Sequence, residues 1–214
     1  MPPNGNAGLT RSLILKSATS IISQDGLEAL TAGRLIELAG ISKGGLYHHF
    51  RTMAEVESEV LERLLQNFII KLSACDEPDS VDNFFEYVEQ EIFENFLVKD
   101  ESNCALFAFT SAAATNLQIG TMLNKFMEEL TLLRLKRLKT VSPNVPPVIL
   151  HSAVQLISTL QLGLTARLFS GVDSVSLKNY WQGLRVLLVS AIQQDSSQGL
   201  YLSEGLDTVI PINF

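Results

Sequence analysis

Apolar residues recur at helical spacing along almost the whole chain, whereas strict alternation of apolar and polar residues is nearly absent. Near the N-terminus, Ile14, Ala18, Ile21 and Ile22 are spaced so that they share one face of a helix. Alternation with a period of two is the mark of a half-buried strand. The pattern therefore predicts an all-α protein.

About nine helices are expected from this periodicity and from the residues that start and stop helices. Thr31, Ser42 and Thr52 each precede a periodic segment and favour a helix start. Thr52 and Glu55 together form a capping box. A polar loop is expected at 99–103, a break near Gly120 and a linker at 142–147. The expected helices cover about 9–24, 32–40, 43–50, 53–73, 81–97, two segments within 104–139, 148–169 and 177–194.

The chain is apolar enough to require a large core, a cavity, a subunit interface or a membrane segment, with 46% hydrophobic residues and a mean hydropathy of +0.20. A membrane-spanning helix needs about 18 apolar residues in a row. The 104–114 segment is too short, and 148–169 is interrupted by His151, Gln155, Gln161 and Arg167. We therefore expect buried surface and no membrane partner.

Charge divides the chain into two parts. Residues 1–52 hold five basic and three acidic residues, a net charge of +2, whereas residues 53–214 hold 11 basic and 20 acidic residues, a net charge of −9. A basic part joined to an acidic part is typical of a nucleic-acid-binding domain with a separate second function. We predict a head at 1–52 and a larger body at 53–214, connected by the helix that begins at 53.

Two short helices with a glycine turn between them are predicted within residues 31–50, and this arrangement is a helix-turn-helix. The second helix of such a unit enters the major groove of DNA with its N-terminus first. Leu46 and Phe50, four residues apart, would face the core. Lys43 and Tyr47 would share a polar face able to meet phosphates and base edges.

The segment 39–50, Ala-Gly-Ile-Ser-Lys-Gly-Gly-Leu-Tyr-His-His-Phe, resembles the DNA-binding signature of the TetR family, as does 25–31 before it. The resemblance covers about residues 9–57. It implies a dimeric regulator, usually a repressor, with a three-helix head and a helical body that binds a small-molecule effector. It further implies an operator of double-stranded DNA as partner, and it implies DNA contacts from Thr31, Arg34, Ser42, Lys43, Gly44, Gly45, Tyr47, His48 and Arg51.

The sequence departs from the family pattern at two positions. Met53 stands where the family often has a lysine, and Arg51 could supply the charge instead. Gly45 follows Gly44, and each glycine inside a short helix costs roughly 1 kcal/mol relative to alanine. Either the backbone approaches DNA closely there, or the helix is loose until it binds.

The body carries no motif of its own, and its candidate residues follow from residue type and spacing. Candidate effector contacts are Phe84, Phe107, His151 and Arg167.

A continuous apolar stripe on the last two helices predicts a four-helix bundle in a homodimer, with burial inside one protomer as the alternative. The candidate interface residues are Leu156, Leu160, Trp181, Leu184 and Leu188. A basic cluster at Arg134, Lys136, Arg137 and Lys139 is accounted for by solvation and the helix dipole.

Catalytic, metal and cofactor sites are not expected, because no nucleophile with a neighbouring base, phosphate loop or metal spacing occurs. Cys75 and Cys104 are expected to be free thiols in a cytoplasmic protein. The favoured function is a repressor released from its operator by an apolar or amphipathic effector. One alternative is a helical hydrophobe-binding or protein-interaction module with a degenerate head, and another is a regulator that answers to a protein partner or to no effector.

Overall fold

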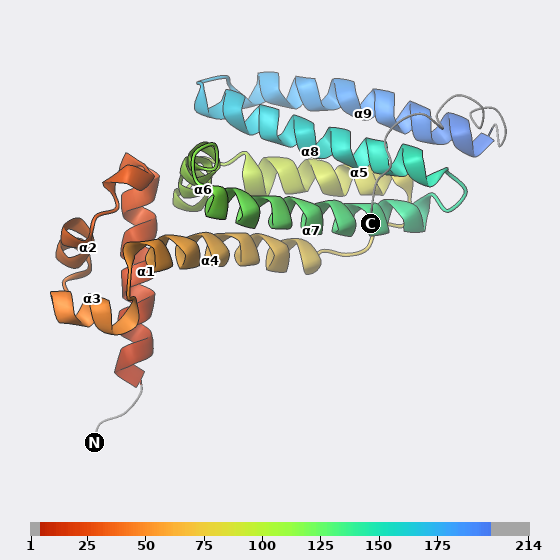
Figure 1. Ribbon diagram of the computed structural model, residues 1–214. Coiled ribbons are helices and arrows are strands. Elements are labelled where there is room, and N and C mark those ends of the chain that lie inside the picture. Colours follow the sequence, from red (N-terminus) through yellow and green to blue (C-terminus); the bar gives the residue numbers. More distant parts are fainter. Residues whose placement is uncertain (1–4, 198–214) are drawn as a thin grey trace.

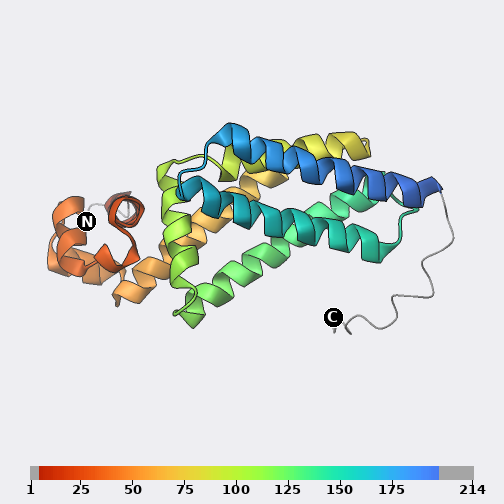
Figure 2. The same ribbon diagram turned by 90° about the horizontal axis from the view of Figure 1, so that it is seen from above.

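The computed structural model describes residues 5–197, and all regular secondary structure in this part of the chain is helical, as predicted. Helices α1, α2 and α3 form a small head at one end of the molecule (Figure 1). Helix α4 runs from the head beneath the body, where α5, α7, α8 and α9 lie along the long direction of the molecule. Helix α6 crosses this bundle at the end that faces the head (Figure 2).

The helices of the described range have the following bounds: α1 Gly5–Asp25, α2 Ala32–Ala39, α3 Lys43–His49, α4 Met53–Ser73, α5 Val81–Gln90, α6 Glu101–Ala112, α7 Leu117–Val141, α8 Pro147–Phe169 and α9 Ser174–Ser197. A short 3₁₀ helix, η1, covers Leu27–Ala29, and a π-helix, η2, covers Glu91–Phe96 directly after α5.

The helix starts in the head follow the predicted caps. The hydroxyl oxygens of Thr31, Ser42 and Thr52 each accept a hydrogen bond from the backbone amide three residues later. Helix α2 ends at Gly40, whose φ of 62° lies in the left-handed region that glycine adopts without strain. Cap and glycine together fix the turn between α2 and α3.

Three expected helix boundaries in the body differ in detail from the structure. The loop expected at 99–103 covers 97–100, because the Asp100 carboxylate caps the amide of Asn103, 2.8 Å away, and starts α6 at Glu101. The break before α7 falls at 113–116 rather than at Gly120, because the Asn116 side chain caps the start of α7. The helix expected over 81–97 changes to π geometry after Gln90, and the Leu97 amide donates to the Ile92 carbonyl.

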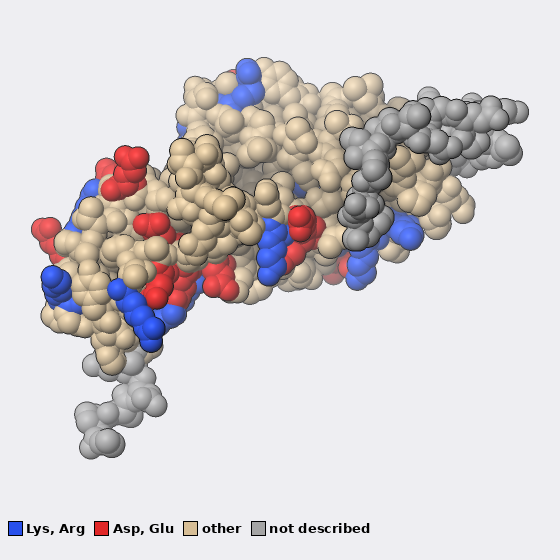
Figure 3. Space-filling view, in the orientation of Figure 1, with Lys and Arg blue, Asp and Glu red and all other residues tan. Residues whose placement is uncertain are grey.

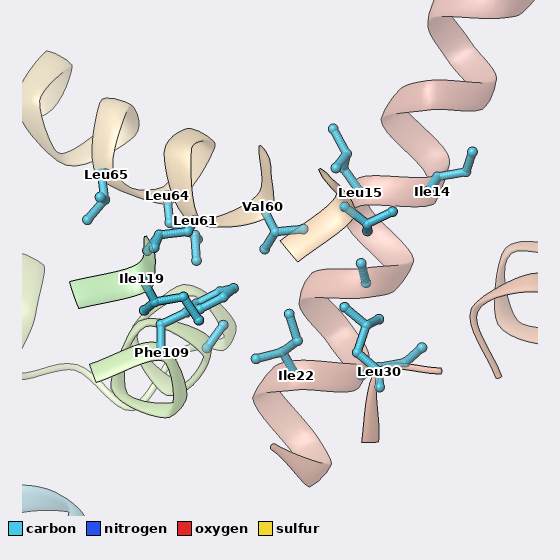
Figure 4. Packing of buried hydrophobic residues seen from close by; sticks show 14 of the residues in the cluster. Ile14, Leu15, Ile22, Leu30, Val60, Leu61, Leu64, Leu65, Phe109 and Ile119 are labelled. Carbon is cyan, nitrogen blue, oxygen red and sulfur yellow. The ribbon is translucent and has the colours of Figure 1, made fainter. Parts of the chain in front are cut away.

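One hydrophobic core joins the head to the body. Ile14, Leu15 and Ile22 of α1 pack in the same cluster as Phe109 of α6 and residues of α4 (Figure 4). The cluster therefore continues across the predicted boundary between residues 52 and 53. A displacement of α6 would act directly on the head, because no separate layer lies between them.

A second core lies between α5, α7, α8 and α9, with Phe84, Phe85 and Trp181 fully buried. Among the described helices α8 has the length and composition of a membrane span, with a mean hydropathy of 1.4 over 18 residues. A core helix of a soluble protein meets the same criterion. In this structure α8 packs against α7 and α9.

Candidate nucleic-acid interface and internal cavity

Helix α3 rests on the head through one face and presents the other to solvent. Leu46 and Phe50 are 1% and 3% exposed, which confirms their predicted place in the core. Lys43 and His48 are exposed, and Tyr47 is 43% exposed. The Lys43 ammonium has no ion-pair partner among the described residues. This face combines a cation, a phenol and an imidazole, which are groups that bind phosphates and base edges.

The remaining candidate contacts flank α3. Ser42 caps α3 through the Gly45 amide, with an oxygen–nitrogen distance of 3.0 Å. Thr31 is exposed at the start of α2, and its hydroxyl proton is not needed for the cap. Arg51 is exposed between α3 and α4, and its backbone amide donates to the Glu55 carboxylate at 2.6 Å. The structure thus brings the predicted residues to neighbouring positions around α3.

Two arginines of the head are engaged within the protein. Arg34, a predicted DNA contact, forms an ion pair with Asp25. Arg11, which the sequence reasoning did not single out, pairs with Glu59 and lies over the Phe50 ring, 4.9 Å from its centroid. Arg11 therefore ties α1 to α4 behind the candidate recognition helix.

The fold itself does not require the paired glycines of α3. Neither has a positive φ, and a Cβ on Gly44 would meet only the Ser42 hydroxyl, at 3.9 Å. A Cβ on Gly45 would stand 3.3 Å from the same oxygen, which is a tight contact. Gly44 is exposed in the first turn of α3, so its missing side chain leaves the backbone open to a close neighbour.

Charged side chains are unevenly distributed over the surface. In the view of Figure 3 they gather on the head and along the lower edge of the molecule, and few lie on the upper part of the body. The exposed surface of α8 and α9 instead carries large apolar side chains. These are Val148, Leu156, Leu162, Val175, Val186 and Leu187, which are between 49% and 69% exposed.

A cavity of about 440 Å³, partly open to solvent, lies in the body between α6, α7 and α8. This volume falls within the range of small-molecule sites. Its walls are mostly apolar and aromatic, and no lining residue has a titratable side chain. The lining residues are Phe96, Asn103, Leu106, Phe107, Thr110, Ala113, Ala114, Gly120, Leu123, Asn124, Phe126, Met127, Ser158, Gln161, Leu162 and Thr165.

Arg134, which the sequence reasoning placed in a solvated cluster, is fully buried beside this cavity. Its guanidinium forms an ion pair with the buried carboxylate of Glu91 and donates to Ser158 Oγ at 3.0 Å and to Gln161 Oε1. The expectation was wrong because Arg134 lies four residues from both Leu130 and Leu138, on the buried face of α7. The residues of this network were missed, although that spacing is visible in the sequence.

Arg137 is buried as well, which corrects the same expectation for a second member of the cluster. Its Nη2 donates to the carbonyls of Leu72 and Cys75, each at 3.1 Å, at the C-terminal end of α4. Its guanidinium lies 4.3 Å from the centroid of the Tyr87 ring. Burial, followed by the Glu91 carboxylate, raises the pKa of Tyr87. Arg137 therefore fastens the end of α4 that lies far from the head.

The candidate effector contacts are dispersed in the structure. Phe107 lines the cavity and stacks on Phe169, with centroids 4.2 Å apart. Phe84 is fully buried in the second core, and His151 is not among the lining residues. Arg167 is exposed and lies over the Tyr180 ring at 5.3 Å. Of the four candidates, the structure brings only Phe107 to the cavity.

The candidate interface residues divide into two groups. Leu156 is 49% exposed, and Leu160 and Leu184 are half-buried. Trp181 is fully buried and Leu188 is 7% exposed, because both pack in the second core. The Trp181 indole also donates to Glu89 at 3.0 Å. The burial of Trp181 and Leu188 in the second core corrects the expectation that these two side chains contact a partner subunit.

Comparison with known proteins finds one family model that matches most of the head and the start of α4. The family described as "Bacterial regulatory proteins, tetR family" matches residues 14–60. "Uncharacterized HTH-type transcriptional regulator YhgD" of Bacillus subtilis is 29% identical over 112 residues, which cover 52% of this chain and 56% of that protein. "HTH-type transcriptional regulator AcrR" of Shigella flexneri is 34% identical over 53 residues, which cover 25% of each chain. The chain thus matches about half or less of the length of these curated relatives.

Solved structures share the whole fold at low sequence identity. A TetR transcription regulator from Haloarcula marismortui superposes with a TM-score of 0.72 at 15% identity, over 86% of this chain and 98% of that chain. A transcriptional regulator from Saccharomonospora viridis, solved in complex with choline, has a TM-score of 0.63 at 16% identity, over 88% and 97% of the two chains.

No group of three or more His, Cys, Asp or Glu side chains within the described range is placed to hold a metal ion.

Proposed function

We propose that the chain is a transcriptional regulator of the TetR family, whose model matches residues 14–60, and that it binds an operator in double-stranded DNA and is released from it by a small molecule. The main support for this proposal is the geometry of α3. Its capped N-terminus and its Lys43–Tyr47 face are exposed, while Leu46 and Phe50 hold the helix on the head. Membership of a family of regulators also implies a non-enzymatic, cytoplasmic protein.

In this proposal α3 lies in the major groove. Lys43 and His48 are placed to reach base edges, and Tyr47 is placed to donate to a phosphate. Thr31 and Arg51 flank the helix at positions suited to further phosphate contacts. Arg34 would contact DNA only by sharing its guanidinium with Asp25.

Two heads are expected to act together, because the exposed face of α8 and α9 fits a second copy of this chain. Leu156 and Leu187 expose apolar side chains on this face. Gly163 and Gly183 are exposed within the two helices, and a Cβ on either would meet nothing within 4 Å. A helical glycine costs about 1 kcal/mol relative to alanine, and the protomer gains no contact in return. Close approach of a partner helix would account for both glycines.

A charge placed on this face should therefore break the dimer. We expect Leu187→Glu to sediment as a monomer in analytical ultracentrifugation. Leu132→Glu should remain a dimer, because Leu132 is similarly exposed on α7, outside this face. Dimers that survive Leu187→Glu, or a wild-type protein that is monomeric at micromolar concentration, would contradict this interface.

Helix α6 provides a route from the cavity to the head. Ala105 and Phe109 pack in the core shared with α1, whereas Phe107 and Thr110 line the cavity. A ligand that widens the cavity would push α6 against α1. At the far end of α4 the last carbonyls are held by Arg137, so movement of α4 would be greatest where it carries the head. The regulator from Saccharomonospora viridis binds choline, which supports a ligand-binding body in this fold.

Operator binding can be tested with DNA from upstream of the protein's own gene in a mobility-shift assay across a salt series. We expect tight binding that resists competitor DNA and weakens steeply with salt. Tyr47→Ala should weaken binding, whereas Leu132→Ala, exposed on α7 outside the α8–α9 face, should leave it unchanged. If selection from random DNA also finds no preferred sequence, the helical interaction module becomes the better account.

A further inference from the structure

A buried ion pair lies behind the polar end of the body cavity. It does not line the cavity, but it contacts two side chains that do. Arg134 and Glu91 are both fully buried and paired with each other. The same guanidinium also donates to Ser158 Oγ and to Gln161 Oε1. Ser158 and Gln161 are 5% and 6% exposed, and both line the cavity.

The guanidinium fixes which atoms these two side chains offer to the cavity. Arginine only donates hydrogen bonds, so the amide oxygen of Gln161 must face Arg134 and its NH₂ group must face away. That nitrogen has no hydrogen-bond partner in the described part of the chain. The Ser158 oxygen accepts from Arg134, which leaves its hydroxyl proton free. This end of the cavity therefore presents hydrogen-bond donors.

The cavity offers no charge to a ligand. None of its lining residues is titratable, and the positive charge of Arg134 is compensated by Glu91 at contact distance. An anion or a cation would lose its hydration on entry without gaining an opposite charge. The rest of the wall is apolar, with Phe96, Phe107 and Phe126 among its residues.

We infer that the cavity binds a neutral, largely apolar molecule whose carbonyl or ether oxygen accepts hydrogen bonds from Gln161 and Ser158. This inference rests on the proposed function and names the chemical class of its effector. The acceptor end of the molecule lies toward α8, and its apolar part lies against the phenylalanines. Asn103 on α6 adds one acceptor, because its amide nitrogen already donates to the Asn95 carbonyl at 2.9 Å.

Three probes of equal chain length test the class: methyl decanoate, decanoate and decylamine. Each is titrated against the full chain carrying the neutral fluorescent dye N-phenyl-1-naphthylamine, and dye displacement is measured. We expect methyl decanoate to bind at least tenfold more tightly than either charged probe. Equal or tighter binding of decanoate or decylamine, or no binding of methyl decanoate, would overturn the inference.

The variant Gln161→Glu tests the donor directly, because it keeps an acceptor for Arg134 and replaces the NH₂ group by an oxygen. We expect methyl decanoate to bind about fivefold more weakly to this variant and decylamine to bind more tightly. A folding defect would weaken all three probes together, so opposite changes in the affinities for methyl decanoate and decylamine separate recognition from stability. Gln90→Glu, on the exposed face of α5, should leave all three affinities unchanged.

A Gln161→Glu variant that binds methyl decanoate as tightly as the wild type and decylamine no more tightly would overturn the inference. Probe binding is measured without DNA, and operator binding is measured in parallel without probes. Loss of the predicted probe preference with operator binding intact would refute only the ligand class. If the wild-type protein binds no operator, the proposed function itself is refuted.

Discussion

Replacing Arg134 by methionine should be among the most destabilising single substitutions in the body. The change removes the guanidinium and keeps a side chain of similar length. Arg134 makes hydrogen bonds to Glu91, Ser158 and Gln161, and both members of its ion pair are 0% exposed. After the substitution the Glu91 carboxylate would remain buried without its partner.

The expected cost follows from this geometry. Breaking a buried ion pair by removing one partner costs about 3–5 kcal/mol, whereas native proteins are stable by about 5–15 kcal/mol. We therefore expect Arg134→Met to lose about a fifth or more of the free energy of unfolding, measured by urea denaturation followed by circular dichroism. The double variant Glu91→Leu/Arg134→Met should recover most of the loss, because no charge is then left buried.

Lys136→Met is the matched control, since Lys136 is exposed two residues further along α7. Its free energy of unfolding should stay within about 0.5 kcal/mol of the wild type. A cost below about 1 kcal/mol for Arg134→Met, or a double variant as unstable as the single one, would refute the buried ion pair.

Two further predictions concern the head and the thiols. Gly44→Ala should stabilise the protein by about 0.4–1 kcal/mol yet lower operator affinity in fluorescence anisotropy, because the added methyl stands on the exposed first turn of α3. Gly8→Ala, equally open in α1, should stabilise without that loss, and unchanged affinity of Gly44→Ala would refute close backbone approach. Burial and the nearby Asp100 raise the pKa of the Cys104 thiol, so less of it is thiolate at neutral pH. Iodoacetamide should therefore modify exposed Cys75 first, as followed by mass spectrometry, and faster modification of Cys104 would contradict the described burial.

The head could be predicted closely from the sequence because its structure is determined by local signals. Thr31, Ser42 and Thr52 cap helices through bonds that span only three residues. Gly40 ends α2 by a backbone conformation that favours glycine. The positions of Leu46 and Phe50 follow from one helical repeat. The DNA contacts inferred for this region remain predictions.

The body could be predicted only in outline, because its decisive contacts join residues far apart in the chain. The carboxylate that neutralises Arg134 lies 43 residues earlier, and Gln161 lies 27 residues later. Periodicity reports which face of a helix is apolar but not which helix covers it. For this reason the sequence predicts that Trp181 lies on an apolar stripe and is buried. It does not tell whether the core of the protomer or a dimer interface buries it. The cavity, formed by three helices, has no local signature.

Selection from random double-stranded DNA by the full chain tests whether two copies of α3 read DNA together. We expect enrichment of a sequence with two inverted half-sites, centred one helical turn of about 10 base pairs or a multiple of it apart. Tyr47→Ala should give little or no enrichment of that sequence. If the wild-type protein enriches no sequence, or if Tyr47→Ala enriches the same sequence equally well, two copies of α3 do not read DNA together.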